Sequence, residues 1–323
     1  MNYAPIAACT VFVACTAGGA QAQPYPVKVV RMIVASAPGG GSDTVGRSLA
    51  QKLGQALGQQ VIVDNRAGAG GRIGTEIAAR SPADGYTLLI GTSSAMVVAP
   101  ALYAKLPYDM HKDFSPVAQL ATAAYVLVVH PSVPAHSVKQ LIALAKAQPG
   151  RLTYASSGSG TNNHLAGELF GTLAGIKMVH VPYRSSGLAT LAVVSGESDL
   201  IFSNILPAAP AMRSGRLRPL GVASQRRSPL IPDVPTIEEN GFPGVVVEQF
   251  YGLLAPAGTP QEIVRRLNEE TVKAMQSDDI RRRLRAEGSE VHVSSPEELG
   301  KLIVSEIRKW EKVARQAGIS LAH

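Results

Sequence analysis

Hydrophobic and polar positions along this chain follow two periods, which predicts a series of short strands and amphipathic helices. The run VVRMIVA at 29–35 is almost continuously apolar and is typical of a buried strand. Apolar residues then recur at every fourth position from Val45 to Leu57, which is the spacing of one helix face. Further strand-like runs lie at 59–65, 85–92 and 122–130. This alternation indicates an α/β fold with parallel sheets that are covered by helices on both faces.

Three later helices are predicted from the residues at their N-termini. The pairs with capping-box spacing are Ser137 with Gln140, Thr259 with Glu262, and Ser295 with Glu298. Pro260 and Pro296 are predicted to occupy the first helical position of the last two helices. From Leu299 to Ala317 apolar residues recur at helical spacing, which predicts a helix packed on the core or, alternatively, on a partner helix.

The centre of the chain repeats the architecture of its beginning. The segment RLTYASSGSGTNNHLAGELF at 151–170 combines a strand, a Gly/Ser loop and a helix, as does the segment at 29–53. A chain of 323 residues is long enough for two lobes. We expect one lobe to consist of 23–122 and 248–323 and the other of 123–247, because the run VVVEQFYGLLAP can return the chain to the first lobe.

Residues 1–22 have the features of a secretory signal peptide. The segment has an apolar stretch and ends in Ala20-Gln21-Ala22, an A-x-A cleavage signal, so the mature chain is expected to begin near Gln23 in the export compartment. Cys9 and Cys15 both lie in this segment, and a mature chain without cysteine has no disulfide and no cysteine nucleophile. A lipoprotein with Cys15 as the lipid-bearing residue is the alternative.

Charge and composition limit the classes of partner. The formal net charge is +7, but the basic residues are dispersed apart from QRRS and IRRRLR, and aromatic residues make up only 5%. Proteins that bind single-stranded nucleic acid stack bases on aromatic side chains, and this chain has few of them. We therefore expect no nucleic-acid partner. After the signal segment, no apolar run is long enough to cross a bilayer, and we expect a soluble protein.

Two Gly/Ser loops are the candidate binding elements, since each lies between a predicted strand and a predicted helix. The first contains Ala37, Pro38, Gly39, Gly40, Gly41, Ser42 and Asp43, and the second Ser157, Gly158, Ser159, Gly160, Thr161, Asn162, Asn163 and His164. The first backbone N–H groups of a helix lack an intrahelical partner, and the helix dipole favours an anion there. Either loop alone is better explained as a tight turn with a helix cap. Two such loops on facing lobes predict that both bind the same carboxylate, one from each side.

Other chemistries fit the sequence less well. Neither loop has the glycine spacing of a dinucleotide site, a phosphate-binding loop or a nucleophile elbow, although a secreted serine hydrolase stays an alternative. His164 and Glu168 are four residues apart but have no third ligand in spacing, so no metal or cofactor is predicted. In the Gly-rich segment DNRAGAGGRIGTE, which precedes a helix expected from about Gly74, Arg66 or Arg72 is either an anion ligand or a solvated side chain.

The chain resembles the periplasmic solute-binding receptors of tripartite tricarboxylate transporters, the TctC or Bug family, in a series of segments that follow one another along the sequence. They are YPVKVVRMIVASAPGGGSDTVGRSLAQKL, QQVIVDNRAGAGGRIGTEIAARSPADGYTLLIGT, LPYDMHKDFSPVAQLA, LTYASSGSGTNNHLAGELF, MVHVPYRSSG, GESDLIFSNI, RPLGVASQRRSPLIPDVPTIEENGFPG and FYGLLAPAGTP. The resemblance implies a type II periplasmic binding protein with two crossover strands, monomeric and without enzymatic activity. It also implies that a small organic carboxylate is captured between the lobes and delivered to a membrane permease. A sensor that presents the ligand to a membrane receptor is the alternative.

The resemblance also implies a set of site residues. The carboxylate-binding loops fall at Ala37–Asp43 and Ser156–His164, with Asp43 expected to orient its own helix. Strand ends that could complete the cleft carry Thr92, Ser93, Tyr183 and Asn204, and Phe250 or Tyr251 could form an apolar wall. The chain departs from the family pattern at Ser36, where an aromatic residue is expected, and at Arg184, where lysine is usual.

Overall fold

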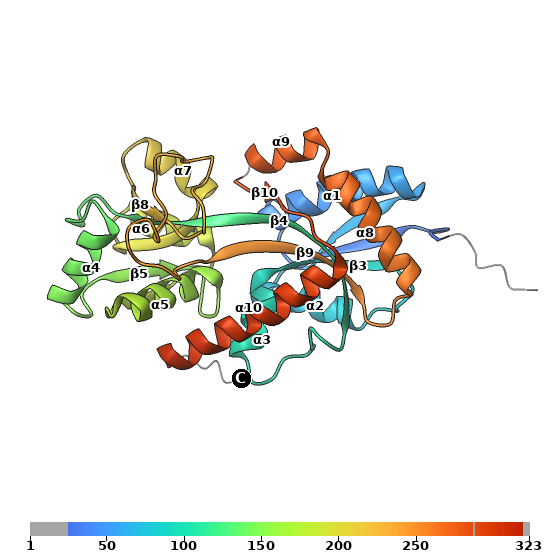
Figure 1. The fold of residues 1–323 in the computed structure, drawn as a ribbon, viewed down its shortest axis with the longest axis horizontal. Helices are drawn as coiled ribbons and strands as arrows, with labels where there is room; N and C mark the ends of the chain where they lie inside the picture. The colour runs from blue at the N-terminus through green and yellow to red at the C-terminus, as the bar shows by residue number, and fades with distance from the viewer. Residues whose placement is uncertain (1–24, 287, 319–323) are drawn as a thin grey trace, which may run out of the picture.

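Two long strands, β4 (Phe114–Val129) and β9 (Glu248–Pro256), run through the middle of the molecule and connect its two lobes (Figure 1). This computed structural model describes residues 25–286 and 288–318. The predicted signal segment, with its cleavage site and both cysteines, lies outside the described residues.

The first lobe is built on a parallel unit of three strands, β1 (Val30–Val34), β2 (Val61–Asn65) and β3 (Thr87–Thr92), in the order β2-β1-β3. β9 is antiparallel to β3 and to β4, and the short β10 (Glu290–Val291) also pairs with β4. The helical elements of this lobe are α1 (Gly41–Leu57), η1 (Ala69–Gly71), α2 (Arg72–Ala79), the π-helical turn η2 (Ser94–Val98), α3 (Ala99–Leu102), α8 (Gln261–Met275), α9 (Asp278–Ala286) and α10 (Pro296–Ala317).

The second lobe contains a second parallel unit, in the order β6-β5-β7, with β5 (Thr153–Ser156), β6 (Val179–Pro182) and β7 (Leu200–Asn204). The second half of β4 is antiparallel to β7 and to β8 (Arg218–Val222). The helices of this lobe are α4 (Val138–Ala147), α5 (Asn162–Ala174), α6 (Ser186–Val194) and α7 (Ile205–Arg213).

The sheets are mixed, which corrects the expectation of purely parallel sheets. The strand–loop–helix pattern predicts the two parallel units, and both are present. The antiparallel pairs arise because β4 leaves the first lobe and β9 returns to it, so that these two strands run in opposite directions. Strand direction depends on this long-range connection and not on the local pattern. The exact boundaries of the lobes stay a prediction.

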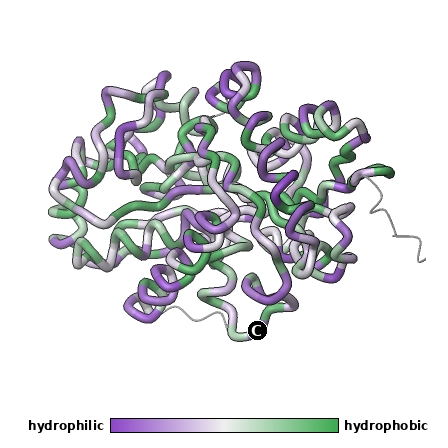
Figure 2. The backbone as a smooth tube through the Cα atoms, turned by 45° about the vertical axis from the view of Figure 1, so that its right-hand side comes forward, coloured by the Kyte–Doolittle hydropathy of each residue, from purple (hydrophilic) through white to green (hydrophobic). Residues whose placement is uncertain are grey.

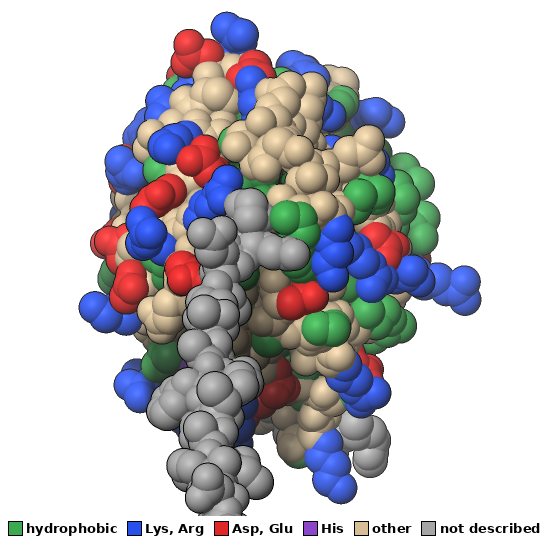
Figure 3. All heavy atoms as spheres, turned by 90° about the vertical axis from the view of Figure 1, so that its right-hand side faces the viewer, with side chains coloured by type: hydrophobic (Ala, Val, Ile, Leu, Met, Phe, Trp, Pro, Cys, Tyr) green, Lys and Arg blue, Asp and Glu red, His purple; other side chains and the backbone are tan. Residues whose placement is uncertain are grey.

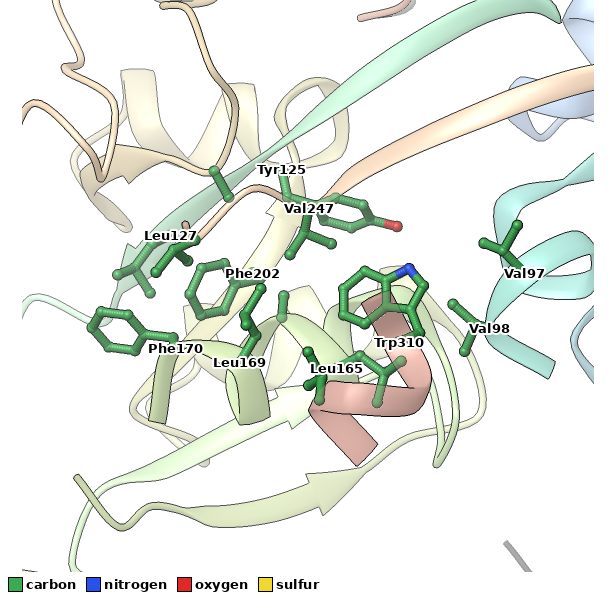
Figure 4. Close-up of a cluster of buried hydrophobic side chains, with 14 of the residues drawn as sticks. Val97, Val98, Tyr125, Leu127, Leu165, Leu169, Phe170, Phe202, Val247 and Trp310 are labelled. Carbon is green, nitrogen blue, oxygen red and sulfur yellow. The ribbon is translucent and has the colours of Figure 1, made fainter. Parts of the chain in front are cut away.

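The predicted helix faces are buried as expected. The α1 stripe from Val45 to Leu57 packs in the first-lobe core with β1 and β3. The helices carry alternating hydrophilic and hydrophobic stretches along the backbone (Figure 2). The α10 stripe also packs on the core, against α5 of the second lobe and η2 of the first. Figure 4 shows Trp310 of α10 between Val97 and Val98 on one side and Leu165 on the other, so this core joins both lobes.

Two of the three predicted helix caps are present. Ser295 forms a complete capping box with Glu298, and the Ser137 hydroxyl accepts a hydrogen bond from the Gln140 N–H. The prediction for Thr259 is wrong, because its hydroxyl donates to the Pro256 carbonyl at 2.7 Å and Pro260 is the N-cap of α8. The Thr259 hydroxyl therefore stabilises the tight turn before α8 and does not cap the helix.

Charged side chains of both signs cover the end of the first lobe. Figure 3 shows lysine and arginine interspersed with aspartate and glutamate on this face. Surface ion pairs of the first lobe include Lys52 with Asp279 and Arg31 with Asp64. Within residues 25–286 and 288–318, no helix has the length and apolar character that a membrane crossing requires.

Candidate ligand-binding site between the two lobes

The first Gly/Ser loop leads from β1 into α1, and Asp43 fixes its shape. The Asp43 carboxylate accepts hydrogen bonds from the Gly39 N–H at 2.9 Å, the Arg47 Nε at 3.0 Å and the Asn65 side chain at 2.9 Å. Burial alone would raise the pKa of this carboxyl group, but the bonds from Arg47, Gly39 and Asn65 outweigh it and lower the pKa below its usual value. Asp43 therefore orients its own helix, as expected.

The backbone at the start of α1 supplies the second set of candidate donors. The first N–H groups of the helix have no acceptor inside it, and the first bond back is from the Thr44 N–H to the Gly40 carbonyl at 3.0 Å. A Cβ atom at Gly41 would collide with the Tyr251 hydroxyl, so a side chain does not fit there. Ser36, the departure from the family pattern, lies with its Oγ 2.6 Å from the Ser42 Oγ and fixes that hydroxyl.

The second Gly/Ser loop leads from β5 into α5 and is organised around Asn163. The Asn163 Oδ1 accepts from the Ser157 N–H at 3.2 Å, the Ser157 hydroxyl at 2.9 Å and the Thr161 hydroxyl at 2.7 Å. Gly158 and Gly160 have φ values of 121° and 76°, a region that disfavours residues with a Cβ atom. Asn163 and these glycines are thus required for the shape of the loop.

Several N–H groups of the second loop are also unpaired. Asn162, Asn163 and His164 form the first turn of α5 and have no acceptor inside the helix, where the first bond is from the Leu165 N–H to the Thr161 carbonyl at 3.0 Å. The Ser159 N–H has no partner among the described residues. Free amides at the positive end of a helix dipole form an anion-binding site in many proteins.

A cavity of about 200 Å³ lies between the lobes and contains the second loop. It is lined by Ser157, Gly158, Ser159, Gly160 and Thr161 of the second lobe and by Ala69, Gly70, Arg72, Ser94, Ala99 and Tyr103 of the first. Larger hollows, such as one of about 920 Å³ beside Phe114 and Asn268, contain no residue of either loop. This cavity is therefore the candidate ligand site.

The first loop does not line this cavity but adjoins it. The β1 strand that precedes the loop ends next to Ala35, whose carbonyl oxygen lies 3.1 Å from the point that a Cβ atom on Gly71 would occupy. Gly71 also has a φ of 94°, so this close approach requires glycine. Gly71 in turn precedes Arg72 in the cavity wall. The first loop and the cavity thus share one edge of the first-lobe sheet, where the parallel strands β1, β2 and β3 end.

A buried polar cluster connects the lobes beside the cavity. The Asn162 side-chain amide at the start of α5 donates to the Ser93 hydroxyl at 2.6 Å and to the Gln249 Oε1 at 2.9 Å. The Tyr125 hydroxyl donates to the same Gln249 oxygen at 3.3 Å, and the Phe250 N–H donates to the Ser93 hydroxyl at 3.4 Å. The Asn162 Oδ1 is buried without a partner among the described residues. These bonds hold the second loop against the first lobe in this conformation.

Two stacked histidines contact residues of the second loop and stabilise its conformation. The His164 and His180 rings lie 4.1 Å apart between centroids, and Tyr154 stacks on His180 at 5.0 Å. The His164 Nδ1 accepts from the Gly160 N–H at 3.1 Å, and the His180 Nε2 lies 2.5 Å from the Ser156 hydroxyl. Burial lowers the pKa of both imidazoles to about 4, and for His164 the neighbouring His180 adds to the effect. His164 is 6% exposed, and its Nε2 lies 4.0 Å from the Glu168 Oε1.

These histidines predict a loss of stability in mild acid. Below pH 6.5 the unfolded chain binds protons that the folded imidazoles exclude, so the contribution of the two histidines to the free energy of unfolding falls from pH 6.5 towards pH 4 and then levels off. We expect His164→Asn, which keeps an acceptor for the Gly160 N–H, to reduce this fall by about 1–3 kcal/mol. Urea unfolding at a series of pH values measures the difference.

The raised pKa of Glu248, which is caused mainly by burial, acts in the opposite direction, so the comparison is between the wild type and the variant. His136→Asn is the control, because His136 is exposed and is expected to leave the pH dependence unchanged. Equal slopes for the wild type and His164→Asn between pH 4 and 6.5 would contradict the prediction.

The remaining predicted residues lie at various distances from the cavity. Thr92 ends β3, and its Oγ1 lies 3.5 Å from the point that a Cβ on Gly71 would take. The Tyr183 hydroxyl bonds to Glu197 at 3.0 Å, although its carbonyl oxygen faces Gly158. Asn204 ends β7 opposite Tyr125, and the Phe250 side chain is buried in the core. Contact of these four residues with a ligand stays a prediction.

Several residues that the fold brings to the site were not predicted from the sequence. Tyr103, Gln249 and His180 carry no motif and come from separate segments. The sequence does not decide whether Arg66 or Arg72 binds an anion. In the structure Arg66 is paired with Asp64 at 2.9 Å, whereas Arg72 lines the cavity. The helix α2 begins at Arg72 and not near Gly74, which gives the arginine its place at the cleft.

The serine–histidine pair at the second loop, Ser156 with His180, does not favour a serine hydrolase. Ser156 lies next to His180 but is 0% exposed. Its hydroxyl also donates to the Gly158 carbonyl and accepts from the Gly158 N–H, both at 3.1 Å. The pair is therefore positioned to hold the loop and not to attack a substrate. Among the described residues no group of three or more side chains could hold a metal ion.

The two lobes, the paired crossing strands and the cavity between the lobes define a solute-binding protein of the periplasmic type. The chain belongs to the TctC family, described as "Tripartite tricarboxylate transporter family receptor", which matches residues 45–319. It is 38% identical over 315 residues to protein BugT of Bordetella pertussis, covering 96% of each chain. A protein from the tcbD-tcbE intergenic region of Pseudomonas sp. strain P51 is 39% identical over 290 residues, covering 90% of this chain and 86% of the relative.

Solved structures agree with this family. The structure of R. palustris Rpa4515 with adipate has a TM-score of 0.82 at 35% identity and covers 93% of this chain and 100% of that chain. MatC from Rhodopseudomonas palustris with bound malate has a TM-score of 0.78 at 34% identity and covers 90% and 99%. Periplasmic binding protein BugD has a TM-score of 0.79 at 29% identity and covers 93% and 100%. The family and these neighbours are binding proteins, not enzymes.

Proposed function

We propose that this chain is a periplasmic receptor that captures a small organic carboxylate between its lobes and delivers it to the permease of a tripartite tricarboxylate transporter. The observation that carries the proposal is the loop Ser157–Thr161, which lines the cavity between the lobes and leads into unpaired amides at the start of α5. The adipate and malate in two similar structures support a carboxylate as the ligand.

In the proposed complex, backbone N–H groups hold one carboxylate of the ligand. The donors are those of Ser159 and the first turn of α5, joined by those at the start of α1 when the lobes close. Hydroxyl groups of Ser42 and Ser159 add further donors, and water molecules bridge the rest. A carboxylate that accepts several N–H bonds is held without a cationic side chain, because charge-assisted bonds are stronger than neutral ones.

Lobe closure follows from binding to both sides of the cleft. A ligand shifts the equilibrium towards the closed form only by its higher affinity for that form. The bonds from Asn162 to Ser93 and Gln249 join the second loop to the first lobe beside the cavity, where closure would bring the two sides together. The closed form is the one that the permease would recognise.

A thermal-shift screen followed by calorimetric titration tests the proposal. The panel contains mono-, di- and tricarboxylates, acidic amino acids, aromatic acids and neutral sugars of similar size. At least one carboxylate should stabilise the purified protein, by about 2.7 kcal/mol at a concentration a hundred times its Kd. Binding of sugars alone, or turnover of an ester or amide, would contradict the proposal.

The permease partner needs a separate test in cells. Deletion of the gene should abolish uptake of the carboxylate that binds in vitro, and re-expression should restore it. Normal uptake with a lost transcriptional response to the same compound would instead indicate a sensor that presents its ligand to a membrane receptor.

A further inference from the structure

Arg72 is the single charged residue in the described wall of the cavity between the lobes. It is the first residue of α2 and follows Gly71, whose φ of 94° and close approach to the Ala35 carbonyl fix the turn. The arginine is therefore held at the cleft by a backbone that has little freedom to move.

Two contacts hold the guanidinium group in one orientation. The Arg72 Nε donates to the Ala69 carbonyl at 2.9 Å, and the Cζ lies 4.0 Å from the centroid of the Tyr103 ring. Stacking on an aromatic face is favourable for the planar guanidinium. These contacts use Nε and one face of the group, so the N–H donors of both Nη atoms remain.

The charge of Arg72 has no acidic partner among residues 25–286 and 288–318. Other arginines of this region are paired: Arg66 with Asp64 at 2.9 Å and Arg80 with Glu76 at 2.7 Å. In the part of the chain that the structure describes, no carboxylate forms an ion pair with Arg72, and neither Nη atom has a hydrogen-bond partner. An oriented guanidinium with two free Nη atoms matches the geometry of a carboxylate that binds through both oxygens.

The opposite wall of the cavity also favours an anion. It is formed by Ser157–Thr161 and contains the unpaired Ser159 N–H. The cavity of about 200 Å³ is small compared with the roughly 300–1,000 Å³ of pockets for drug-sized ligands. A solute that satisfies both walls is therefore short and carries an anionic group at each end.

We infer that Arg72 determines the specificity of this receptor by binding the distal carboxylate of a short dicarboxylate whose proximal carboxylate is held by the second loop. The inference rests on the proposed function, because it concerns the same cleft. Tyr103 acts as a positioning residue, since it holds the guanidinium without a charge of its own.

The test compares acids of equal chain length that differ only in the distal carboxylate. The pairs are succinate with butyrate, glutarate with valerate, and adipate with hexanoate, and the Kd of each is measured calorimetrically. The wild type should prefer at least one dicarboxylate over its partner by at least about tenfold. Arg72→Gln should weaken that dicarboxylate by about ten- to a hundredfold and change the monocarboxylate less than about threefold.

Matched variants separate recognition from folding. Arg66→Gln removes a paired arginine of the same segment and should leave every Kd unchanged. Tyr103→Phe keeps the stacking face and should retain the preference, whereas Tyr103→Ala should reduce it. The melting temperature without ligand should be the same for the wild type and Arg72→Gln.

The outcomes distinguish the specificity role of Arg72 from the proposed function. If the wild type binds acids but Arg72→Gln changes neither member of a pair, or weakens both equally, the specificity role is wrong and the proposed function stands. If the wild type binds no acid of the wider panel, both are wrong.

Discussion

Replacing Gly40 with leucine is expected to lower the affinity for the carboxylate ligand by about a hundredfold or more, with an unchanged fold. Gly40 is the N-cap of α1 and directly precedes Gly41, Ser42 and Asp43, whose N–H groups have no acceptor inside the helix, so a leucine there would crowd a ligand bound to them. Loss of two charge-assisted hydrogen bonds, each about 1.5–3 kcal/mol, accounts for this effect. Calorimetric titration with the best ligand of the screen measures it.

The fold should tolerate this change for a local reason. Gly40 has a φ of −86° and a ψ of 169°, which any residue adopts, and the only atom within 4 Å of an added Cβ is the Ala37 carbonyl oxygen at 3.7 Å. Gly187→Leu is the matched control, because a Cβ there also meets open space but lies on α6 away from the cavity. Unchanged affinity in Gly40→Leu would show that the first loop does not hold the ligand.

Replacing Trp310 with alanine is expected to lower the free energy of unfolding by about 3–5 kcal/mol. Trp310 is 2% exposed and fills the space between η2 of the first lobe and α5 of the second (Figure 4). Removal of its side chain leaves a cavity where the two lobes share one core, so both lose packing contacts. Urea unfolding monitored by circular dichroism measures the change.

Two further variants define how much of this loss comes from the shared core. Trp310→Phe keeps an aromatic ring and should lose less stability than Trp310→Ala. Leu191→Ala changes a side chain that is 58% exposed and should alter stability by less than about 0.5 kcal/mol. A loss below about 1 kcal/mol in Trp310→Ala would indicate that α10 does not hold the lobes together.

Local features of the fold could be predicted from the sequence because they depend on neighbouring residues. The four-residue spacing from Val45 to Leu57 predicts the buried face of α1, and the α10 stripe predicts its packing on the core. The Ser295–Glu298 box was predicted because its bonds lie within one turn. Thr259 shows the limit of such spacing, since a competing turn bond to Pro256 takes the hydroxyl.

Parts of the site were predictable for the same reason. A Gly/Ser segment between a strand and a helix predicts free N–H groups at the helix start, and both loops have this form. The expectation that Asp43 orients its own helix also follows from local geometry, and its carboxylate accepts from the Gly39 N–H four residues earlier.

The sequence alone thus determined the two parallel units, the two loops and the family to which the chain belongs. Only the tertiary structure decided which side chains meet at the cleft: Arg72 with Tyr103, Asn162 with Gln249, and His180 with Ser156. It also decided that Arg66 is paired and Arg72 is not, although both belong to one segment. The physical reason is that periodicity records which face of an element is buried, whereas these contacts depend on how distant elements pack and on where β4 and β9 cross between the lobes.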